Sequence, residues 1–589
     1  MFNDFKQIRR IFTASAILML VACASQQSVV QEPAVEASQP EQAAEPVQPE
    51  VSQVPDRPFD ADTLYALLVA EIAGSRNHYD VAVSNYVQQA LSTRDPGVTA
   101  RAARIARLLN AHDAALEMAF LWIELDPDNS EAHFIAGAEL ARTGQLMEAA
   151  EHSAILLEQG EAGFFEAIAA SAAQADDEAM ALQLQTRYAE LLQIYPDSAS
   201  LHLGQSLLLQ YAGELEQALV TARRAAELEP DNAQSYLQES AILQEMGRVE
   251  EALKKLDGLV KKYPDNQRLR LQYARLLAHS DLPEAQKQFQ RLVEQSPGDP
   301  DFIFSLGLIQ LERGMLVEAA EHFKSLTHGS QHSSSAHYYL GKVAESRGDP
   351  TAALHHYQQV GASAEYLPAV MQAAEILVQM GDVMGAMDYL RTEREQAVLH
   401  ERDSLYLLEA EVLSATGDNV AALATLKTGL AALPQNTRLL YARAMLFTQM
   451  DKIAKAEQDL KQIIYLSPNN AAALNALGYT LADRTNRLNE AYGYIHAAFK
   501  LTPDDGAVLD SMGWVHYRLG NYSDALKYLR QAMATTPDHE IAAHLGEVLW
   551  VTGAQQEAQK TWHTGLELNP GSDLIRDTLE RLDAELGEP

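Results

Sequence analysis

Hydrophobic residues along most of this chain recur every three to four positions, the spacing of one face of an α-helix. The pattern is clearest between Asp505 and Glu540, where it predicts two consecutive helices. Their apolar faces carry Leu509, Met512, Gly513 and His516 in the first helix, and Tyr522, Ala525, Leu529 and Ala532 in the second. Pro537 is expected to end the second helix. One such stripe per helix is too little to form a core alone, so each pair must pack against its neighbours.

The same pattern returns along nearly the whole sequence. Prolines expected to close a helix pair lie 34 residues apart in three groups: Pro196, Pro230 and Pro264; Pro434 and Pro468; Pro503 and Pro537. Glycines recur between the two helices of a pair, and alanines recur in register inside them. A regular period of this length indicates a stack of repeated helix pairs.

The pattern of small residues, leucine and proline formed by Gly513, Ala525, Leu529, Ala532 and Pro537 resembles the 34-residue tetratricopeptide repeat (TPR). This resemblance implies an all-α fold, an α-solenoid of about fifteen helix pairs with an extended concave face. Two irregular places are expected. Residues 158–196 should form a helix pair of altered length, and the polar run 328–335 should be a loop and a hinge.

The amino terminus predicts a lipid anchor. Lys6, Arg9 and Arg10 precede an apolar run, residues 11–21, that is too short to span a membrane. Leu-Val-Ala then precedes Cys23, the single cysteine of the chain. This arrangement resembles the bacterial lipoprotein signal, which implies that residues 1–22 are removed and Cys23 is lipidated. Ala24, in the position where aspartate favours the inner membrane, suggests the outer membrane facing the periplasm. An ordinary secreted protein with a coincidental cysteine is the alternative.

Four regions are therefore expected along the chain. After the signal peptide, residues 23–58 contain the lipidated cysteine and a disordered Pro/Gln/Glu-rich tether. Residues 59–572 form the repeat array, and residues 573–589 form a polar capping helix. No later stretch is apolar enough to span a bilayer, so the lipid alone would hold the protein to the membrane.

The charge balance argues against nucleic acid as a partner. The 589 residues carry a formal net charge of −36, whereas phosphate binding needs clustered lysine and arginine. Acidic side chains on the helix faces keep a long surface soluble and favour basic partners. Contact with water is a sufficient explanation for most of these acidic side chains.

The sequence offers no catalytic residues, metal ligands or cofactor site, so we expect a protein that is not an enzyme. His539 and His544 lie five positions apart, and side chains at that spacing diverge on a regular helix. His328, His332 and His337 have no cysteine or carboxylate group to complete a ligand set. No phosphate-binding loop or nucleophile elbow is present.

The first helix of each TPR lines the groove, and this family property implies a set of binding residues. When the repeats of this chain are aligned with the TPR pattern, the inward positions of these first helices are occupied by Tyr479, Asn475, Trp514, Tyr517, Phe304, Tyr338 and Phe134. Aromatic side chains rimmed by polar ones are typical of peptide-binding hot spots. The alternative is that some of these rings pack between neighbouring helices. Tyr479, Asn475, Trp514 and Tyr517 form the best candidate group because they lie in adjacent units.

The lipid signal, the tether and the acidic array together resemble outer-membrane TPR lipoproteins that serve as adaptors of a periplasmic carboxyl-terminal processing protease. That resemblance implies two kinds of partner, the protease and substrates such as peptidoglycan hydrolases. Two rivals are a scaffold for exopolysaccharide secretion or for pilus and envelope assembly, and an enzyme or its regulatory arm. Proteins that co-purify with the chain would separate these possibilities.

Overall fold

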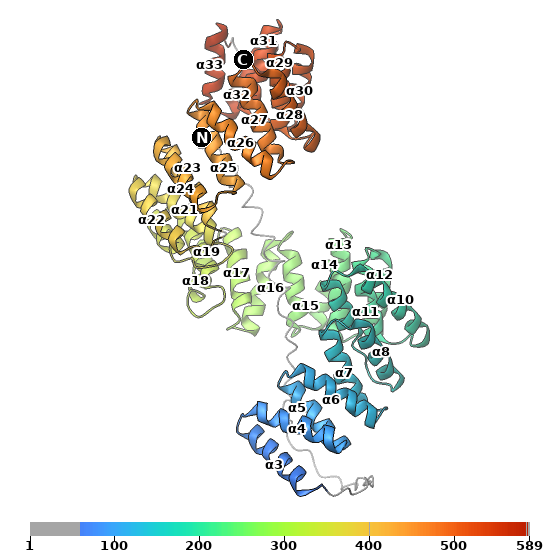
Figure 1. The fold of residues 1–589 in the computed structure, drawn as a ribbon. Coiled ribbons are helices and arrows are strands. Elements are labelled where there is room, and N and C mark those ends of the chain that lie inside the picture. The colour runs from blue at the N-terminus through green and yellow to red at the C-terminus, as the bar shows by residue number, and fades with distance from the viewer. Residues whose placement is uncertain (1–58, 400, 585, 587–589) are drawn as a thin grey trace. The chain divides into compact units, whose positions relative to one another are not determined.

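The computed structural model describes residues 59–399, 401–584 and 586. This part of the chain consists of 31 helices and contains no strand (Figure 1). The all-α solenoid predicted from the period is therefore confirmed. The predicted signal peptide, Cys23 and the predicted tether to residue 58 lie outside the described residues.

The chain divides into two compact units, with the division between residues 322 and 323. The amino-terminal unit contains α3 (Ala61–Ser75), α4 (Tyr79–Thr93), α5 (Pro96–Leu108), α6 (His112–Leu125), α7 (Ser130–Arg142), α8 (Leu146–Glu158), α9 (Phe165–Gln174), α10 (Glu178–Ile194), α11 (Ala199–Tyr211), α12 (Leu215–Leu228), α13 (Ala233–Glu245), α14 (Val249–Lys262), α15 (Gln267–Leu277), α16 (Leu282–Gln295) and α17 (Pro300–Glu312). The division falls within α18 (Leu316–Ser325).

The carboxyl-terminal unit contains α19 (Ser333–Ser346), α20 (Pro350–Tyr357), α21 (Tyr366–Gln379), α22 (Val383–Gln396), α23 (Arg402–Ala415), α24 (Asn419–Ala432), α25 (Thr437–Gln449), α26 (Ile453–Leu466), α27 (Ala471–Arg484), α28 (Leu488–Leu501), α29 (Gly506–Arg518), α30 (Tyr522–Thr535), α31 (His539–Val551), α32 (Gln555–Leu568) and α33 (Asp573–Leu582). Most helices pack chiefly against the next one in the chain, from α3–α4 to α31–α32, but α9 packs chiefly against α11. Helix α33 follows alone against α31 and α32.

Local sequence fixes where each pair begins and turns. Asp505, two residues after Pro503, caps α29 by accepting hydrogen bonds from the backbone N–H groups of Ala507 and Val508, at 2.9 and 3.0 Å. Gly520 ends that helix with φ of +83°, a left-handed conformation that glycine adopts without strain. Equivalent glycines with positive φ separate the helices of eight other pairs: Gly144, Gly213, Gly247, Gly314, Gly348, Gly381, Gly417 and Gly553.

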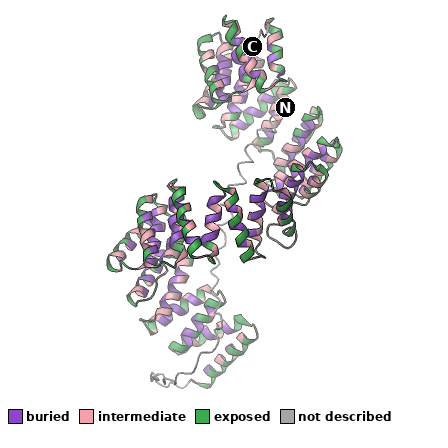
Figure 2. Cartoon of the chain, turned by 180° about the vertical axis from the view of Figure 1, so that it is seen from behind, coloured by how far each residue is buried: buried purple, intermediate pink, exposed green. Residues whose placement is uncertain are grey.

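Buried residues lie along the helices of both units (Figure 2), and alanine and leucine are the most frequent among the buried hydrophobic residues. Ala525, Leu529 and Ala532 of α30 are completely buried. A Cβ atom at Gly513 would lie 2.5 Å from Cγ of Leu529, so only glycine permits this approach of α29 to α30. The small residues of the repeat therefore set the distance between paired helices.

The two irregular places also have a structural counterpart. In residues 158–196, α9 has 10 residues and α10 has 17, so this pair has the altered lengths that the broken register predicted. The polar run at 328–335 forms the turn before α19 and its first residues.

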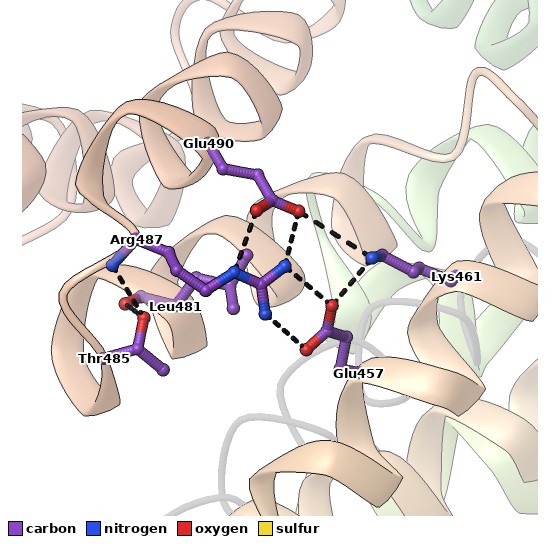
Figure 3. A network of polar contacts seen from close by, with 6 residues as sticks. All are labelled: Glu457, Lys461, Leu481, Thr485, Arg487 and Glu490. Carbon is purple, nitrogen blue, oxygen red and sulfur yellow. Dashed lines mark hydrogen bonds and ion pairs between the residues drawn. The ribbon is translucent and has the colours of Figure 1, made fainter.

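Ion pairs join consecutive helix pairs at their exposed edges. Arg487, just before α28, binds Glu457 of α26 at 2.7 and 2.9 Å and Glu490 at 2.7 and 2.9 Å (Figure 3). Lys461 adds a third contact to the Glu457 carboxylate at 2.7 Å. These bonds lower the pKa of Glu457 to about 2, with the hydrogen bond from Arg487 the largest cause. The network fixes α26 against the start of α28.

Candidate functional site

Three of the last helices contribute to one cluster of aromatic and polar side chains. Tyr479 lies on α27, Trp514 on α29 and His544 on α31. The Trp514 indole stacks on the His544 imidazole, with ring centroids 4.3 Å apart and planes 27° apart. The Tyr479 hydroxyl lies 3.3 Å from Nε2 of His544. Tyr479 and Trp514, which lie 35 residues apart in the sequence, thus contact the same histidine side chain.

Asp510 places a negatively charged carboxylate in this cluster, next to the imidazole of His544. Both of its carboxylate oxygens lie 2.9 Å from Nδ1 of His544, and the two side chains are buried. Burial by itself lowers the pKa of His544, but the negative charges of Asp510, Glu540 and Glu547 outweigh it and raise that pKa. Burial also raises the pKa of the Tyr479 phenol, so this hydroxyl remains neutral. The buried His544–Asp510 pair is thus stabilised in its charged form.

A second polar chain extends from the cluster to the last helix. Tyr517 of α29 donates a hydrogen bond to Glu547 of α31 at 3.0 Å. Arg581 of α33 holds the same carboxylate through two bonds of 2.8 and 2.6 Å. Glu547 is almost fully buried, so the two partners satisfy a charge that would otherwise be costly to bury. Helix α33 is therefore fixed to α31 by a charged group as well as by apolar contacts.

The burial of Trp514 corrects its expected place on an open groove. Its side chain is only 6% exposed and belongs to the hydrophobic core of the unit. The reason is that Tyr479 and His544 contact each other across α29 and cover this face. Asn475 is half-buried, and its amide lies 3.5 Å from the Ala507 carbonyl. The group of four is adjacent, as expected, but its indole packs within the core.

The other three predicted residues have separate surroundings. Half-buried Phe134 contacts Phe164 edge-on at 5.6 Å, and the Arg107 guanidinium lies 4.8 Å from its ring. Phe304 is half-buried on α17. Tyr338 packs near Tyr357 of the neighbouring helix, at a centroid distance of 5.7 Å, and burial raises its pKa to about 12. Phe134 and Phe304 belong to the amino-terminal unit and Tyr338 to the other. Within its unit, Tyr338 has contacts of its own and shares none with the Tyr479–Trp514–His544 cluster.

An open pocket lies on the groove-lining helices one pair earlier, at residues that the sequence analysis did not select. Its volume is about 370 Å³. The residues that line it come from α23, α25, α26, the turn before α27 and α27 itself: Leu407, Thr437, Arg438, Tyr441, Ala442, Ile463, Asn470 and Ala472. Leu407, Tyr441 and Asn475 are spaced 34 residues apart, so the register contained the signal. Asn475 was assigned to the inward face, and the residue 34 positions before it in the same register is Tyr441.

Metal-ligating side chains do not gather anywhere in the described residues. No group of three or more histidine, cysteine, aspartate or glutamate side chains among them could hold a metal ion. His539 and His544 take different partners, since Nδ1 of His539 lies 3.0 Å from the Ser572 hydroxyl and His544 binds Asp510. In the same part of the chain, no helix combines the length and apolar character that crossing a bilayer would require.

These features define a helical-repeat protein, built in each of its two units from stacked pairs of helices. Family models described as tetratricopeptide repeat match residues 243–301, 275–334, 437–470 and 506–539. A TPR repeat-containing protein of Pseudomonas aeruginosa is 42% identical over 528 residues, which cover 89% of this chain and 88% of that protein. The chain belongs to the family of TPR repeat-containing proteins.

Two further similarities are more limited. Human tetratricopeptide repeat protein 7A is 31% identical over 133 residues, 22% of this chain and 15% of that protein. A crystal structure of a tetratricopeptide repeat protein from Parabacteroides merdae has a TM-score of 0.35 and 14% identity, and covers 42% of this chain and 98% of its own. Tetratricopeptide repeats are protein-interaction scaffolds, and the chain is accordingly assigned to this class.

Proposed function

We propose that this chain is an outer-membrane lipoprotein that binds a periplasmic carboxyl-terminal processing protease and presents substrates such as peptidoglycan hydrolases to it. The membrane assignment rests on the signal that ends at Cys23. The binding assignment rests chiefly on one observation, the open pocket on α23, α25 and α27.

The chemistry of this pocket suits an apolar side chain on an extended partner segment. Leu407, Ile463 and Ala472 supply apolar surface, and half-buried Tyr441 adds an aromatic wall. Burial raises the pKa of Tyr441, so the phenol is neutral at pH 7. Side chains that fill a preformed pocket of this kind contribute most of the free energy of many interfaces.

The polar residues at the rim of the pocket suit the backbone of a bound partner segment, on either side of the apolar side chain that fills the pocket. Arg438 is exposed, and its Nη1 donates to Asp403 and to the Ser404 hydroxyl, both at 3.0 Å. These bonds hold the guanidinium at the edge of the pocket and leave its other N–H groups directed to solvent or a ligand. Arginine in that position can donate to a backbone carbonyl or a carboxylate. Specificity would come from this rim and affinity from the apolar floor.

Crosslinking in cells would test the assignment of partner and of surface together. A photo-crosslinking residue replaces Ala472, which is exposed on α27 beside the pocket, or Ala534, which is exposed on α30. The proposal expects adducts with the protease or with a cell-wall hydrolase from position 472 and not from position 534. Adducts with exopolysaccharide-synthase or pilus subunits would instead favour the envelope-assembly scaffold.

A further inference from the structure

Helix α3, the first helix of the amino-terminal unit, has its large apolar side chains on its outer face. Its buried residues are small, namely Thr63, Ala70 and Ala73, and α4 is the helix that it contacts most. Four large side chains are instead between 43% and 70% exposed: Leu64, Tyr65, Leu68 and Ile72. Residues four apart lie on one side of a helix. The exposed residues Leu64, Leu68 and Ile72 therefore form a single stripe, with Tyr65 at its edge.

The last helix of the chain has the opposite character. The exposed residues of α33 are all charged: Asp573, Arg576, Asp577, Glu580 and Arg581. A polar outer face of this kind is what the end of a solenoid needs to stay in solution. A contiguous exposed apolar patch, by contrast, is typical of a surface that another molecule covers. The stripe on α3 therefore indicates a partner at the amino-terminal end.

Two possible partners fit this stripe poorly. The predicted tether, residues 24–58, contains no leucine, isoleucine, methionine, phenylalanine, tyrosine or tryptophan, so it has no matching apolar segment. Helices that lie on a bilayer surface are rich in lysine and arginine on their polar face. The charged residues within α3 are instead Asp62 and Glu71, and Glu71 accepts hydrogen bonds from Tyr86 and Arg101 of the same unit.

The charges at the two ends of α3 suit a second copy of the same helix. Asp62 lies in the first turn, and Arg76 is the residue at which the helix ends. Both are exposed, and among the described residues neither takes part in an ion pair. At about 100° per residue, the two side chains lie on the same flank of the apolar stripe. Their midpoint is residue 69, and the midpoint of the stripe is Leu68.

We propose that two copies of this chain pair through α3, antiparallel and about a two-fold axis near Leu68. Leu64 of each copy then packs on Ile72 of the other, and each Asp62 lies beside Arg76 of the other. Such a contact is self-complementary, as the two-fold symmetry of a homodimer requires. The four exposed side chains supply roughly half of the about 800 Å² that each partner buries in a standard interface, an area typical of a reversible dimer. This inference does not depend on the proposed adaptor role.

Sedimentation equilibrium of the purified full-length chain with Cys23→Ser, which excludes acyl chains, tests the pairing. This protein should show a monomer–dimer equilibrium. Leu68→Asp should weaken the dimer about tenfold or more, because it removes two apolar contacts per dimer and brings two carboxylates together. Val220→Asp, at an exposed position on α12 of the same unit, is the matched control and should dimerise as the parent protein does. Circular dichroism would establish that each variant is folded.

Exchange of the end charges tests the antiparallel arrangement. Asp62→Lys and Arg76→Glu should each weaken the dimer, since each places like charges together at both ends of the contact. The two changes combined re-form the ion pairs with opposite signs and should restore the dimer.

A parent protein that remains monomeric would overturn the proposal, and its binding to phospholipid vesicles in that state would make the bilayer the partner of α3. Undiminished dimerisation of folded Leu68→Asp would overturn the proposal as well. Failure of the combined charge variant to recover the dimer would refute the antiparallel pairing.

Discussion

The hydroxyl of Tyr479 lies 3.3 Å from Nε2 of His544, although 65 residues and an intervening helix pair separate them. The contact passes over α29, where Asp510 holds the other nitrogen of the same imidazole at 2.9 Å. Side chains from three successive pairs thus meet on the face that was expected to remain open. The cluster fixes the last repeats relative to one another, and the open pocket begins one pair earlier.

Truncation of Trp514 should destabilise the last repeats. Because the indole is buried against His544, we expect Trp514→Ala to lower the free energy of unfolding of these pairs by about 3–5 kcal/mol. Thermal melting and hydrogen exchange of residues 471–584 would measure this. Tyr465→Ala, at a side chain that is 85% exposed, is the control and should change stability little. An unchanged melting curve for Trp514→Ala would restore the open-groove interpretation of this residue.

The His544–Asp510 pair should make the carboxyl-terminal repeats more stable at acidic pH. The pKa of His544 is raised in the folded state, so its contribution is complete below the unfolded value of about 6.5 and is lost as pH rises through the folded pKa. Comparison of the wild type with His544→Gln at about pH 5.5 and about pH 8.5 checks this sign. The difference in unfolding temperature should be larger at the acidic pH, and a difference that grows toward alkaline pH would refute it.

The Glu457–Arg487 pair should have the opposite dependence. The pKa of Glu457 is lowered to about 2, so its contribution is complete above the unfolded value of about 4.3 and disappears as pH falls through about 2. Arg487 is 42% exposed, and we therefore expect Arg487→Gln to cost only about 1 kcal/mol at neutral pH. Denaturant unfolding should show this deficit near pH 7 and little deficit near pH 2. Arg530→Gln, in a pair that is about half exposed on both sides, should cost less at neutral pH.

The sequence predicted the contacts within each helix pair, which every repeat needs, and missed the contacts between pairs that are not consecutive. Gly513 and Ala525 follow from the 34-residue period, because every pair needs small residues where its helices touch. The contact of Tyr479 with His544 joins pairs that are not neighbours, so no single repeat contains its signal. Trp514 was consequently assigned to an open face. Tyr441 could have been found, since it lies 34 residues before Asn475 in the same register.

Substitution of Cys23 tests the membrane anchor. Cys23 is the single thiol and follows Leu-Val-Ala, so Cys23→Ser should abolish lipid labelling and release the protein into the soluble periplasm. Fractionation with high-salt washing would measure this release, with Ser25→Ala as a neighbouring control that remains anchored. A Cys23→Ser protein that stays in the outer-membrane fraction would contradict the lipoprotein assignment.

The rate at which the protease cleaves a peptidoglycan hydrolase, measured with and without the purified chain, tests the central claim most directly. The chain should show no proteolysis of its own and should accelerate cleavage by the protease. Ala472→Arg places a long charged side chain beside the pocket from an exposed position, and should remove most of the acceleration without loss of stability. Ala534→Arg, exposed on α30, should retain it. If the chain leaves the cleavage rate unchanged, or if Ala472→Arg accelerates cleavage as the wild type does, the adaptor role assigned to this pocket is wrong.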